Sequence, residues 1–302
     1  MKISKKNLSV LIVTFRSSKI IERCIKSISK DIDIVIIDNS NDYFLKKKIE
    51  KKYSNVRFFL SNKNLGMGAG NNLGFRFIKK NYVFIINPDV VLKKNTINEL
   101  INSSNLIDNF SILSPIVKNK KYLNFKNFKK EKNLSFKKPF KVKSVDGFAM
   151  LLNLKKINKV LNIKKFKIFD ENIFLYLEND DLCKNLIDKN ESIYVVPTAI
   201  VNHLGGKSVN KEFTNEIEFS RNWHWIWSRF YFTKKHYGFL SAAIKLFPIL
   251  MSASFKFFYY SIFNNDYKKK IYHQRIKGFV AAFLGKSSYY RPLQKINDPE
   301  SL

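Results

Sequence analysis

Short apolar runs that alternate with amphipathic runs constrain the fold of this chain more than any other feature. The strand-like runs cover residues 8–14 (LSVLIVT), 32–38 (IDIVIID), 56–60 (VRFFL) and 82–87 (YVFIIN). They are separated by helix-like runs over 17–28, near 43–52 and near 68–80. Strands that are apolar on both faces and joined through helices form parallel sheets. The sequence therefore predicts an α/β fold in which a mostly parallel sheet is flanked by helices.

The pattern changes near residue 210, after which it is helical and rich in aromatic residues. We therefore expect an α/β domain over 1–210. A helical, aromatic-rich and basic C-terminal extension is expected over 211–302.

The most apolar part of this extension, residues 239–263, is interrupted by Lys245, Pro248 and Lys256. It contains no uncharged apolar run of the roughly 18 residues that indicate a membrane-spanning helix. The segment could lie in a membrane interface with its lysines reaching outward, or pack on the body of the protein.

The net charge of +31, from 55 Lys and Arg against 24 Asp and Glu, gives a surface that attracts polyanions. A coding bias toward Lys, Asn, Ile and Phe explains the excess equally well. Residues 118–143 concentrate the charge, with 11 lysines and one glutamate. Their poor periodicity predicts an exposed, partly mobile segment, either a solvated loop or a polyanion-binding surface.

The chain contains two cysteines, Cys24 and Cys183, too few for a disulfide framework or a structural zinc site. A cytoplasmic location fits this composition. The first residues, MKISKKNLSVLIVTF, resemble a signal peptide, but their apolar run is short and ends at Arg16 without a clear cleavage site. A first β-strand is the better interpretation.

Polar and aromatic residues follow three of the predicted strands, namely Thr14-Phe15, Asp38-Asn39-Ser40 and Asn87-Pro88-Asp89. In open parallel sheets, ligands bind beyond the carboxyl ends of the strands. Asp89 is the most informative of these residues, because an unpaired carboxylate at the tip of a buried strand is costly to desolvate. A divalent cation is one way to compensate that charge.

Three further motifs carry polar groups suited to chemistry. The stretch NKNLGMGAGNNLGF, residues 62–75, combines four glycines with Asn64, Asn71 and Asn72, and does not match a dinucleotide fingerprint. Its glycines would let the backbone approach a ligand, unless they form an ordinary flexible turn. In ENDDL, Glu178, Asp180 and Asp181 begin a predicted helix, either as a general base or as ordinary capping residues. His203 follows another apolar strand and is a candidate metal ligand alongside Asp89.

The order of nine motifs resembles the glycosyltransferases of family 2, and in particular their rhamnosyltransferase-like branch. The resemblance spans roughly residues 8–292 and rests on LSVLIVTFRSS, IIDNSND, NKNLGMGAGNNLGF, FIINPDVVL, VDGFAMLL, FDENIFLYLENDDLCKNL, NHLGGKS, RNWHWIWSRFYFTKKHYG and RIKGFVAAFLGK. It implies a GT-A fold with a Rossmann-like nucleotide-sugar half, about 1–115, and an acceptor half, about 116–210. It also implies a nucleotide-sugar donor, a Mg²⁺ or Mn²⁺ ion, and inversion at the anomeric carbon.

The resemblance assigns a role to each candidate site residue. Donor binding falls to Thr14, Phe15, Asp38, Asn39, Asn64, Gly66, Asn71, Asn87 and Asp89. Within this set the first two line the nucleotide pocket and Asp38 hydrogen-bonds the base. Acceptor binding falls to Gly147 and Trp223, metal binding to Asp89 and His203, and catalysis to the cluster Glu178, Asn179, Asp180 and Asp181.

Two positions depart from the family pattern. Asn87 replaces the first aspartate of Asp-x-Asp, so metal affinity would depend more on Asp89, His203 and the donor phosphates. Asn179 stands where the family places its catalytic base, and an amide cannot take up a proton at neutral pH. Glu178 or Asp181 is therefore the expected base.

The leading hypothesis is a sugar transferase that builds a cell-surface polysaccharide or lipopolysaccharide. It would use a dTDP-, UDP- or GDP-sugar, with rhamnose as the branch's common sugar, and a lipid-linked glycan acceptor. The basic surface and aromatic helices suit peripheral attachment to anionic lipid at the inner face of the cytoplasmic membrane. A catalytically impaired homologue is the alternative that Asn179 raises. A basic RNA-binding protein is a remote one, because no RNA-binding motif is present and no nucleic-acid partner is expected.

Overall fold

The computed structural model describes residues 3–107, 109–117, 122–128, 137–163, 166–204 and 214–292. The chain divides into two compact units. The first, the α/β unit, comprises Met1–Asp170 and Asn179–Asn210, and the second, the helical unit, comprises Glu171–Glu178 and Lys211–Leu302. The short segment Glu171–Glu178 thus groups with the C-terminal helices. The expected division into donor and acceptor halves stays a prediction.

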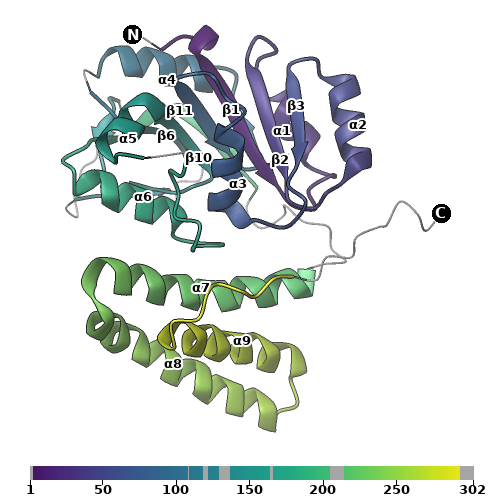
Figure 1. Cartoon of the computed structure of the whole chain (residues 1–302), viewed down its shortest axis with the longest axis vertical. Helices are drawn as coiled ribbons and strands as arrows, with labels where there is room; N and C mark the ends of the chain where they lie inside the picture. Colours follow the sequence, from purple (N-terminus) through teal and green to yellow (C-terminus); the bar gives the residue numbers. More distant parts are fainter. Residues whose placement is uncertain are drawn as a thin grey trace. The chain divides into compact units, whose positions relative to one another are not determined.

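The α/β unit is built on a mixed sheet (Figure 1). The path of hydrogen-bonded neighbours runs β3 (Val56–Leu60), β2 (Asp33–Asp38), β1 (Leu8–Thr14), β4 (Tyr82–Ile86), β10 (Ala149–Asn153), β6 (Ile112–Val117), β11 (Ile193–His203) and β5 (Val90–Leu92). The first four strands are parallel, as the sequence predicts. Beyond them the sheet is mixed, because β10 runs antiparallel to β4 and β6, and β11 runs antiparallel to β5 and β8 (Phe140–Lys141).

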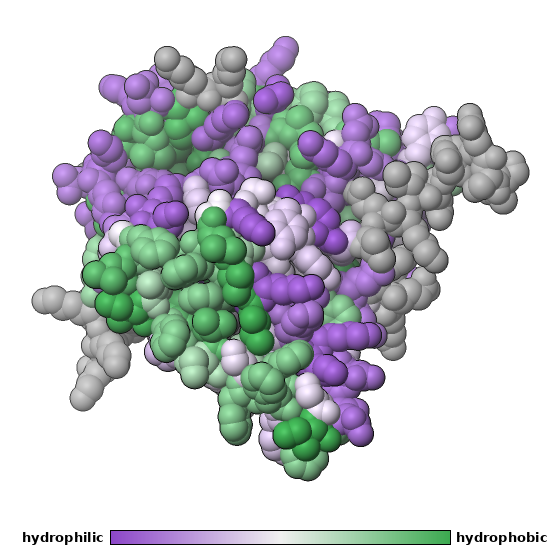
Figure 2. Space-filling model, turned by 60° about the horizontal axis from the view of Figure 1, so that its bottom comes forward, coloured by the Kyte–Doolittle hydropathy of each residue, from purple (hydrophilic) through white to green (hydrophobic). Residues whose placement is uncertain are grey.

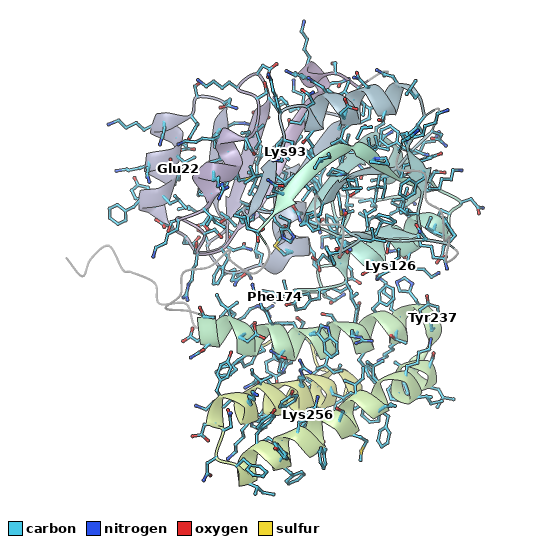
Figure 3. The ribbon with its side chains drawn as sticks, turned by 180° about the vertical axis from the view of Figure 1, so that it is seen from behind. Glu22, Lys93, Lys126, Phe174, Tyr237 and Lys256 are labelled. Carbon is cyan, nitrogen blue, oxygen red and sulfur yellow. The ribbon has the colours of Figure 1, made fainter. Side chains whose placement is uncertain are left out.

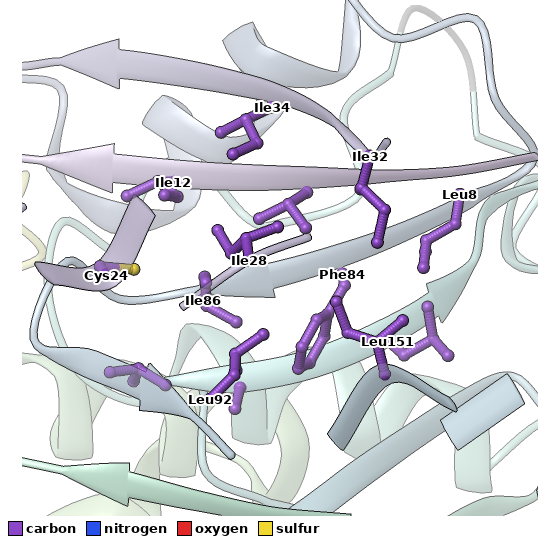
Figure 4. Close-up of a cluster of buried hydrophobic side chains, with 14 of the residues drawn as sticks. Leu8, Ile12, Cys24, Ile28, Ile32, Ile34, Phe84, Ile86, Leu92 and Leu151 are labelled. Carbon is purple, nitrogen blue, oxygen red and sulfur yellow. The ribbon is translucent and has the colours of Figure 1, made fainter. Parts of the chain in front are cut away.

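Each face of the sheet packs against its own hydrophobic core. Because side chains alternate along a strand, Val10 and Ile12 point into one core while Leu11 and Val13 point into the other. The first core, shown in Figure 4, also receives apolar residues from α1 (Ile21–Lys26), α2 (Tyr43–Lys52) and α4 (Thr96–Asn105). The second receives them from α3 (Gly66–Phe75), α5 (Leu154–Val160) and α6 (Glu178–Ile187). Burial on both faces explains why the central strands β1 and β4 are almost entirely apolar.

Local capping sets where two of these helices begin. The Asp42 carboxylate accepts a hydrogen bond from the backbone N–H of Leu45 at the start of α2, at 2.8 Å. The Asn153 side chain does the same for Lys156 at the start of α5. Such caps satisfy backbone donors that a helix leaves unpaired. A short 3₁₀ turn, η1 (Lys5–Asn7), precedes β1.

The basic segment 118–143 differs from the exposed loop predicted for it. Residues 118–121 and 129–136 lie outside the described part of the chain, so the prediction of mobility is untested there. The rest contributes β7 (Phe125–Lys126), which pairs with β9 (Ser144–Val145), and β8. Phe125 and Val142 are buried in the second core. Aromatic and aliphatic residues within this lysine-rich run therefore anchor it to the sheet.

The helical unit consists of α7 (Thr214–Tyr237), α8 (Phe239–Ile262) and α9 (Asp266–Phe283), together with the segment Glu171–Glu178. Its core gathers Trp223, Trp227, Phe230, Leu246 and Phe279. At Gly278 an added Cβ would lie 2.3 Å from the backbone oxygen of Trp223, so a glycine is needed where α9 crosses α7. The segment is held by Ser228, whose hydroxyl donates to the Leu175 oxygen at 2.7 Å.

Trp223 is fully buried in this core, where its ring stacks on those of Trp227 and Tyr290. Its expected contact with an acceptor conflicts with that burial. We therefore describe Trp223 as a core residue of the helical unit.

Lys245, Pro248 and Lys256 interrupt the apolar run without ending the helix, because α8 continues through Pro248. Pro248 is exposed, and it deprives the helix of one backbone N–H donor. Among the described residues, α8 is the one helix long and apolar enough to cross a membrane, judged by length and composition alone.

Candidate active site

The carboxyl ends of β1 and β2 bring the first predicted site residues together. Thr14 lies directly opposite Asp38 in the parallel register, and the backbone N–H of Asn39 donates to the Thr14 oxygen at 2.8 Å. Thr14 is buried, and its hydroxyl has no hydrogen-bond partner among the described residues. A buried hydroxyl without a partner is unfavourable, so this atom is available to a ligand.

Asp38 is fully buried, and its carboxylate shapes the loop that follows β2. One oxygen accepts from the hydroxyl of Ser40 at 2.6 Å, and the other accepts from the backbone N–H of Asp42 at 2.8 Å. Burial raises the pKa of Asp38, and the hydrogen bonds from Ser40 and Asp42 oppose that rise. The base-binding role expected for Asp38 would use the lone pairs that these bonds leave.

The residues after β1 include a cation to which the sequence analysis assigned no role. The guanidinium of Arg16 lies over the half-buried ring of Phe15, 5.2 Å from its centroid. The backbone of Arg16 has φ 51°, and its N–H donates to the Ser40 hydroxyl at 3.1 Å. An arginine held at a strand end is suited to phosphate recognition. Its position directly after Thr14-Phe15 was the available signal.

Asn39 ties the start of the glycine-rich helix to the sheet. Its amide nitrogen donates to the Gly66 oxygen at 3.0 Å, and Asn64 accepts from the Gly66 N–H at 3.1 Å. Gly66 has φ 80°, a conformation that favours glycine, directly at the start of α3. Three predicted donor-binding residues therefore form one hydrogen-bonded corner.

Two glycines of α3 have a different role from the one expected. An added Cβ at Gly70 would lie 2.8 Å from a methyl carbon of Val13, and one at Gly74 would lie 2.3 Å from a methyl carbon of Leu11. These glycines let the helix pack closely on β1, and do not open the backbone to a ligand. The flexible-turn interpretation is also wrong, because the stretch is helical.

The two adjacent asparagines of α3 differ in their contacts. Asn72 is structural, because its side chain exchanges two hydrogen bonds with the backbone of Phe169. Asn71 is buried, and its side-chain oxygen has no hydrogen-bond partner among the described residues. Asn71 therefore keeps its predicted place in donor binding.

The structure brings Asp89 and His203 together from distant parts of the chain. Antiparallel pairing of β5 with β11 sets His203 opposite Val90, and the Leu204 N–H donates to the Asp89 oxygen at 3.1 Å. Asp89 Oδ1 lies 3.4 Å from His203 Nε2. The His203 ring stacks on Phe148, with centroids 4.2 Å apart, which fixes its orientation.

The polar atoms around this pair fit a divalent cation. Asp89 is 4% exposed, and its Oδ1 accepts no hydrogen bond among the described residues. The side-chain oxygen of Asn87 is likewise buried without a partner. Carboxylate, amide and imidazole groups are ligands that Mg²⁺ and Mn²⁺ accept. The described residues contain no cluster of three His, Cys, Asp or Glu suited to a metal, so further ligands would come from a bound donor or water.

Asn179 is committed to structure at the position where a base was expected. Its amide nitrogen donates to the Val145 oxygen at 2.7 Å. An added Cβ at Gly147 would lie 3.2 Å from the Asn179 Cβ, so glycine is what lets α6 sit this close to the β9–β10 turn. Gly147, expected to bind the acceptor, thus also has a packing role.

The three carboxylates of this cluster differ in their surroundings. Asp180 forms an ion pair at 2.7 Å with Lys126, which is labelled in Figure 3. Asp181 is 2% exposed and accepts from the Asn185 side chain at 3.3 Å, which leaves little access for an acceptor. Glu178 is half-buried at the first position of α6.

The backbone directly before α6 is strained. Tyr176 and Leu177 both have φ 69°, a region that non-glycine residues rarely occupy. Such strain costs on the order of 1–3 kcal/mol per residue and concentrates at functional sites. The two strained residues directly precede Glu178, the first carboxylate of the cluster.

Asp146 is a site residue that the sequence analysis missed. Its carboxylate accepts a hydrogen bond from the Tyr122 hydroxyl, and its backbone N–H donates to the Asn124 oxygen at 2.9 Å. Burial raises the pKa of Asp146, and the nearby charge of Asp180 adds to the rise. The charge of His203 lowers the pKa of Asp146, so Asp146 is close enough to both His203 and Asp180 for their charges to act on it. Its place before Gly147, within VDGFAMLL, was the signal.

Comparison with known families decides the classification. The sequence model of glycosyl transferase family 2 matches residues 9–174, more than half of the chain. The chain belongs to glycosyl transferase family 2. The rhamnosyltransferase-like branch is a finer assignment that this match does not address.

Two curated relatives resemble parts of the chain. The low-salt glycan biosynthesis hexosyltransferase Agl10 of Haloferax volcanii is 31% identical over 120 residues, which cover 38% of each chain. The poly(ribitol-phosphate) β-N-acetylglucosaminyltransferase TarP of Staphylococcus aureus is 33% identical over 106 residues, or 32% of each chain. The matched region thus spans between about a third and two fifths of these relatives.

Solved structures share the fold across nearly the whole chain. The mannosyltransferase PcManGT of Pyrobaculum calidifontis, solved with GDP-Man and Mn²⁺, has a TM-score of 0.54 at 10% identity and covers 93% of this chain and 88% of its own. S. aureus TarS 1–349 in complex with UDP has a TM-score of 0.51 at 14% identity, covering 99% and 98%. The expected GT-A fold, with its C-terminal helices, is confirmed.

Proposed function

We propose that this chain is an inverting, metal-dependent glycosyltransferase that moves a sugar from a nucleotide-sugar donor to an acceptor hydroxyl. The observation that carries the proposal is the pairing of the buried Asp89 carboxylate with His203 at the end of β4 and β11. Family membership supports the reaction class. PcManGT was solved with GDP-Man and Mn²⁺, and TarS with UDP, which supports a nucleotide-sugar donor and a divalent ion.

In this proposal, Asp89 and His203 hold Mg²⁺ or Mn²⁺, with Asn87 beside them. The bound ion would neutralise negative charge on the departing nucleoside diphosphate. Thr14, Phe15 and Asp38 would bind the nucleoside, while the corner formed by Asn39, Asn64 and Gly66, with Asn71, would position the donor along α3. Apart from Phe15, which contributes an aromatic ring, each of these residues places a buried or hydrogen-bonded polar group at the same edge of the sheet.

A carboxylate must take the proton from the acceptor hydroxyl as that oxygen attacks the anomeric carbon from the opposite face. Glu178, Asp180 and Asp181 remain the candidates from the acidic cluster. Asp146 joins them because its raised pKa and position suit a proton acceptor. The series Glu178→Gln, Asp180→Asn, Asp181→Asn and Asp146→Asn separates them, since only the base should lose turnover while donor affinity is retained.

For the acceptor we propose a lipid-linked or polysaccharide glycan used in cell-surface synthesis. Rhamnose is the proposed sugar, from the resemblance to the rhamnosyltransferase-like branch. The site of action would be the inner face of the cytoplasmic membrane, where the basic chain meets anionic lipid. Agl10 and TarP, whose names refer to glycan biosynthesis and to poly(ribitol-phosphate), support the choice of a glycan or polyol polymer.

A thermal-shift panel tests the donor. The full chain is measured with dTDP-, UDP- and GDP-sugars, each with Mn²⁺, Mg²⁺ or a chelator. A ligand that binds only the folded state raises the melting temperature, by an amount that grows with its concentration over its Kd. We expect one nucleotide class to stabilise the chain only in the presence of metal. If no nucleotide-sugar stabilises it under any metal condition, the proposed function is wrong.

A second candidate function is that of a catalytically impaired homologue that binds donor without transferring it. The commitment of Asn179 to Val145 favours this alternative, because it removes a carboxylate from the expected base position. The two candidates differ in one readout. Release of free nucleoside diphosphate from the stabilising donor, by transfer or by hydrolysis, supports the active enzyme, whereas donor binding without any release supports the impaired homologue.

A further inference from the structure

Helix α8 presents a continuous stripe of large apolar side chains to solvent. Its members recur every three or four residues and are between 54% and 76% exposed: Leu240, Ile244, Phe247, Met251, Phe255, Phe258 and Ile262. This spacing places all seven on one face of a helix of 24 residues, which extends about 36 Å. Figure 2, which turns the α8–α9 side of the helical unit forward, shows the hydrophobic patch and the hydrophilic residues along its border.

The opposite face of α8 is packed, so the stripe is not an unfolded or misplaced helix. Ala242, Leu246 and Ala253 are buried, and the first two belong to the core formed with α7 and α9. The helix therefore has two apolar faces, one packed against its own unit and one exposed to solvent. Exposed apolar patches of this extent mark interaction surfaces.

The charge around the stripe is almost entirely positive. Residues 234–286 contain ten Lys and Arg and a single acidic residue, Asp266. On α8 itself, Lys245 and Lys256 are exposed and stand three turns apart on the same flank of the stripe. Their amines lie near the rings of Tyr237 and Tyr272, at 4.8 and 5.4 Å from the centroids, so both lysines border the apolar face with an aromatic neighbour.

We propose that the exposed face of α8 is a docking surface for an anionic lipid bilayer, with the helix lying in the plane of the interface. The apolar stripe would enter the boundary between headgroups and acyl chains while Lys245, Lys256 and the lysines of α9 meet the anionic headgroups. Long basic side chains at such a boundary keep their stems in apolar surroundings and their charges in water.

Two other occupants fit the observations less well. A spanning α8 would have to leave its packed contacts with α7 and α9, and would carry Lys245 and Lys256 into hydrocarbon. A second copy of this chain, seated face to face on the stripe, would bring two sets of lysines together with no acidic rim on α8 to balance them. An anionic bilayer can bury the apolar stripe and at the same time pair its negative headgroups with the positive border.

This surface deepens the proposed function, since a lipid-linked acceptor would be met at the membrane. Lipid binding is nevertheless measured without any nucleotide or metal. A failure to bind vesicles would therefore overturn the docking surface alone, and a failure to bind nucleotide-sugar would overturn the proposed function alone.

Vesicle co-sedimentation of the full chain tests the docking surface. The vesicles are made of phosphatidylcholine, with or without an equal part of phosphatidylglycerol, and partitioning is measured at low and high salt. The chain should bind the anionic vesicles, more weakly at high salt because screening reduces the contribution of the lysines. The stripe variant Ile244→Gln/Met251→Gln/Phe255→Gln should lower partitioning by on the order of a hundredfold, because three large apolar side chains are removed from the buried face.

The matched control is Phe44→Gln/Leu106→Gln, which removes two apolar side chains that are 76% and 80% exposed elsewhere on the chain. It should bind vesicles like the natural chain. Circular dichroism checks that each variant keeps its helices, and light scattering gives the oligomeric state. Equal vesicle binding by stripe variant and natural chain would overturn the proposal. So would conversion of an oligomer to a monomer by the stripe variant, which would assign the face to a second copy.

Discussion

Replacing Asp89 with asparagine should separate the stability of the fold from the function of the site. Asp89 is 4% exposed, and one of its oxygens accepts no hydrogen bond among the described residues. That oxygen, Oδ1, lies 3.4 Å from Nε2 of His203. An ionised carboxylate buried this deeply is costly to desolvate unless a cation compensates its charge.

The magnitude follows from this desolvation. Leaving a buried polar group unsatisfied costs about 1–3 kcal/mol. Asp89→Asn keeps the shape of the side chain and removes the charge, so the metal-free chain should become more stable by up to about that amount. For a chain of this size each kcal/mol shifts the melting temperature by roughly 2–4 °C. The same change removes a carboxylate ligand, so the stabilisation by Mn²⁺ with nucleotide, about 2.7 kcal/mol at a hundred times Kd, should be lost.

Differential scanning calorimetry at pH 8, with chelator and then with Mn²⁺ and nucleoside diphosphate, measures both effects. Asp188→Asn is the matched control, because it makes the same chemical change at a carboxylate whose side chain is 50% exposed and whose lysine partner is on the surface. This control should change either melting temperature by no more than the loss of a surface ion pair would. The reasoning would be refuted if the Asp89→Asn chain were less stable than the natural chain without metal and still gained the full stabilisation from Mn²⁺ with nucleotide.

Three further predictions concern packing, pH and the position of the base. Gly74→Ala should destabilise the chain by about 1–3 kcal/mol in urea unfolding, because its Cβ would lie 2.3 Å from Leu11, and an unchanged midpoint would contradict this. Burial lowers the pKa of His224 to about 3, so below pH 6.5 the unfolded chain gains a proton that the folded chain does not. Stability should therefore fall by up to about 1.4 kcal/mol per pH unit between pH 6.5 and 3, and His224→Gln should flatten that slope. Asn179→Asp should cost about 1–3 kcal/mol, since a carboxylate cannot donate to the Val145 oxygen, and an increase in stability would argue against that contact.

Much of the fold could be predicted from the chain because its strands are buried on both faces. The four N-terminal strands are rich in apolar residues, so their ends were visible as changes of composition. The antiparallel strands were harder, since pairings such as that of β10 with β4 join distant segments and leave no local pattern. The helical character of residues 239–263 was predictable from their pattern, but not that one helix, α8, would continue through Pro248.

The candidate site was predictable where a residue stands directly at a strand end. Asp89 and His203 were selected in that way, and the structure places them 3.4 Å apart. Roles that depend on the packing of two elements were not accessible. Gly70 and Gly74 were interpreted as glycines that open the backbone to a ligand, but they lie against β1, and Trp223, assigned to acceptor binding by resemblance, is buried in the helical core. Asp146 was missed because the strand that presents it has only two residues.

The most direct measurement is anomalous diffraction at the manganese edge from a crystal of the full chain grown with Mn²⁺ and a nucleoside diphosphate. A divalent ion bridging protein and diphosphate should give a peak about 2 Å from an oxygen of Asp89, within coordination distance of the His203 imidazole and of a phosphate oxygen. A nucleotide bound at the ends of β1 and β2 without a peak beside Asp89 would contradict the account.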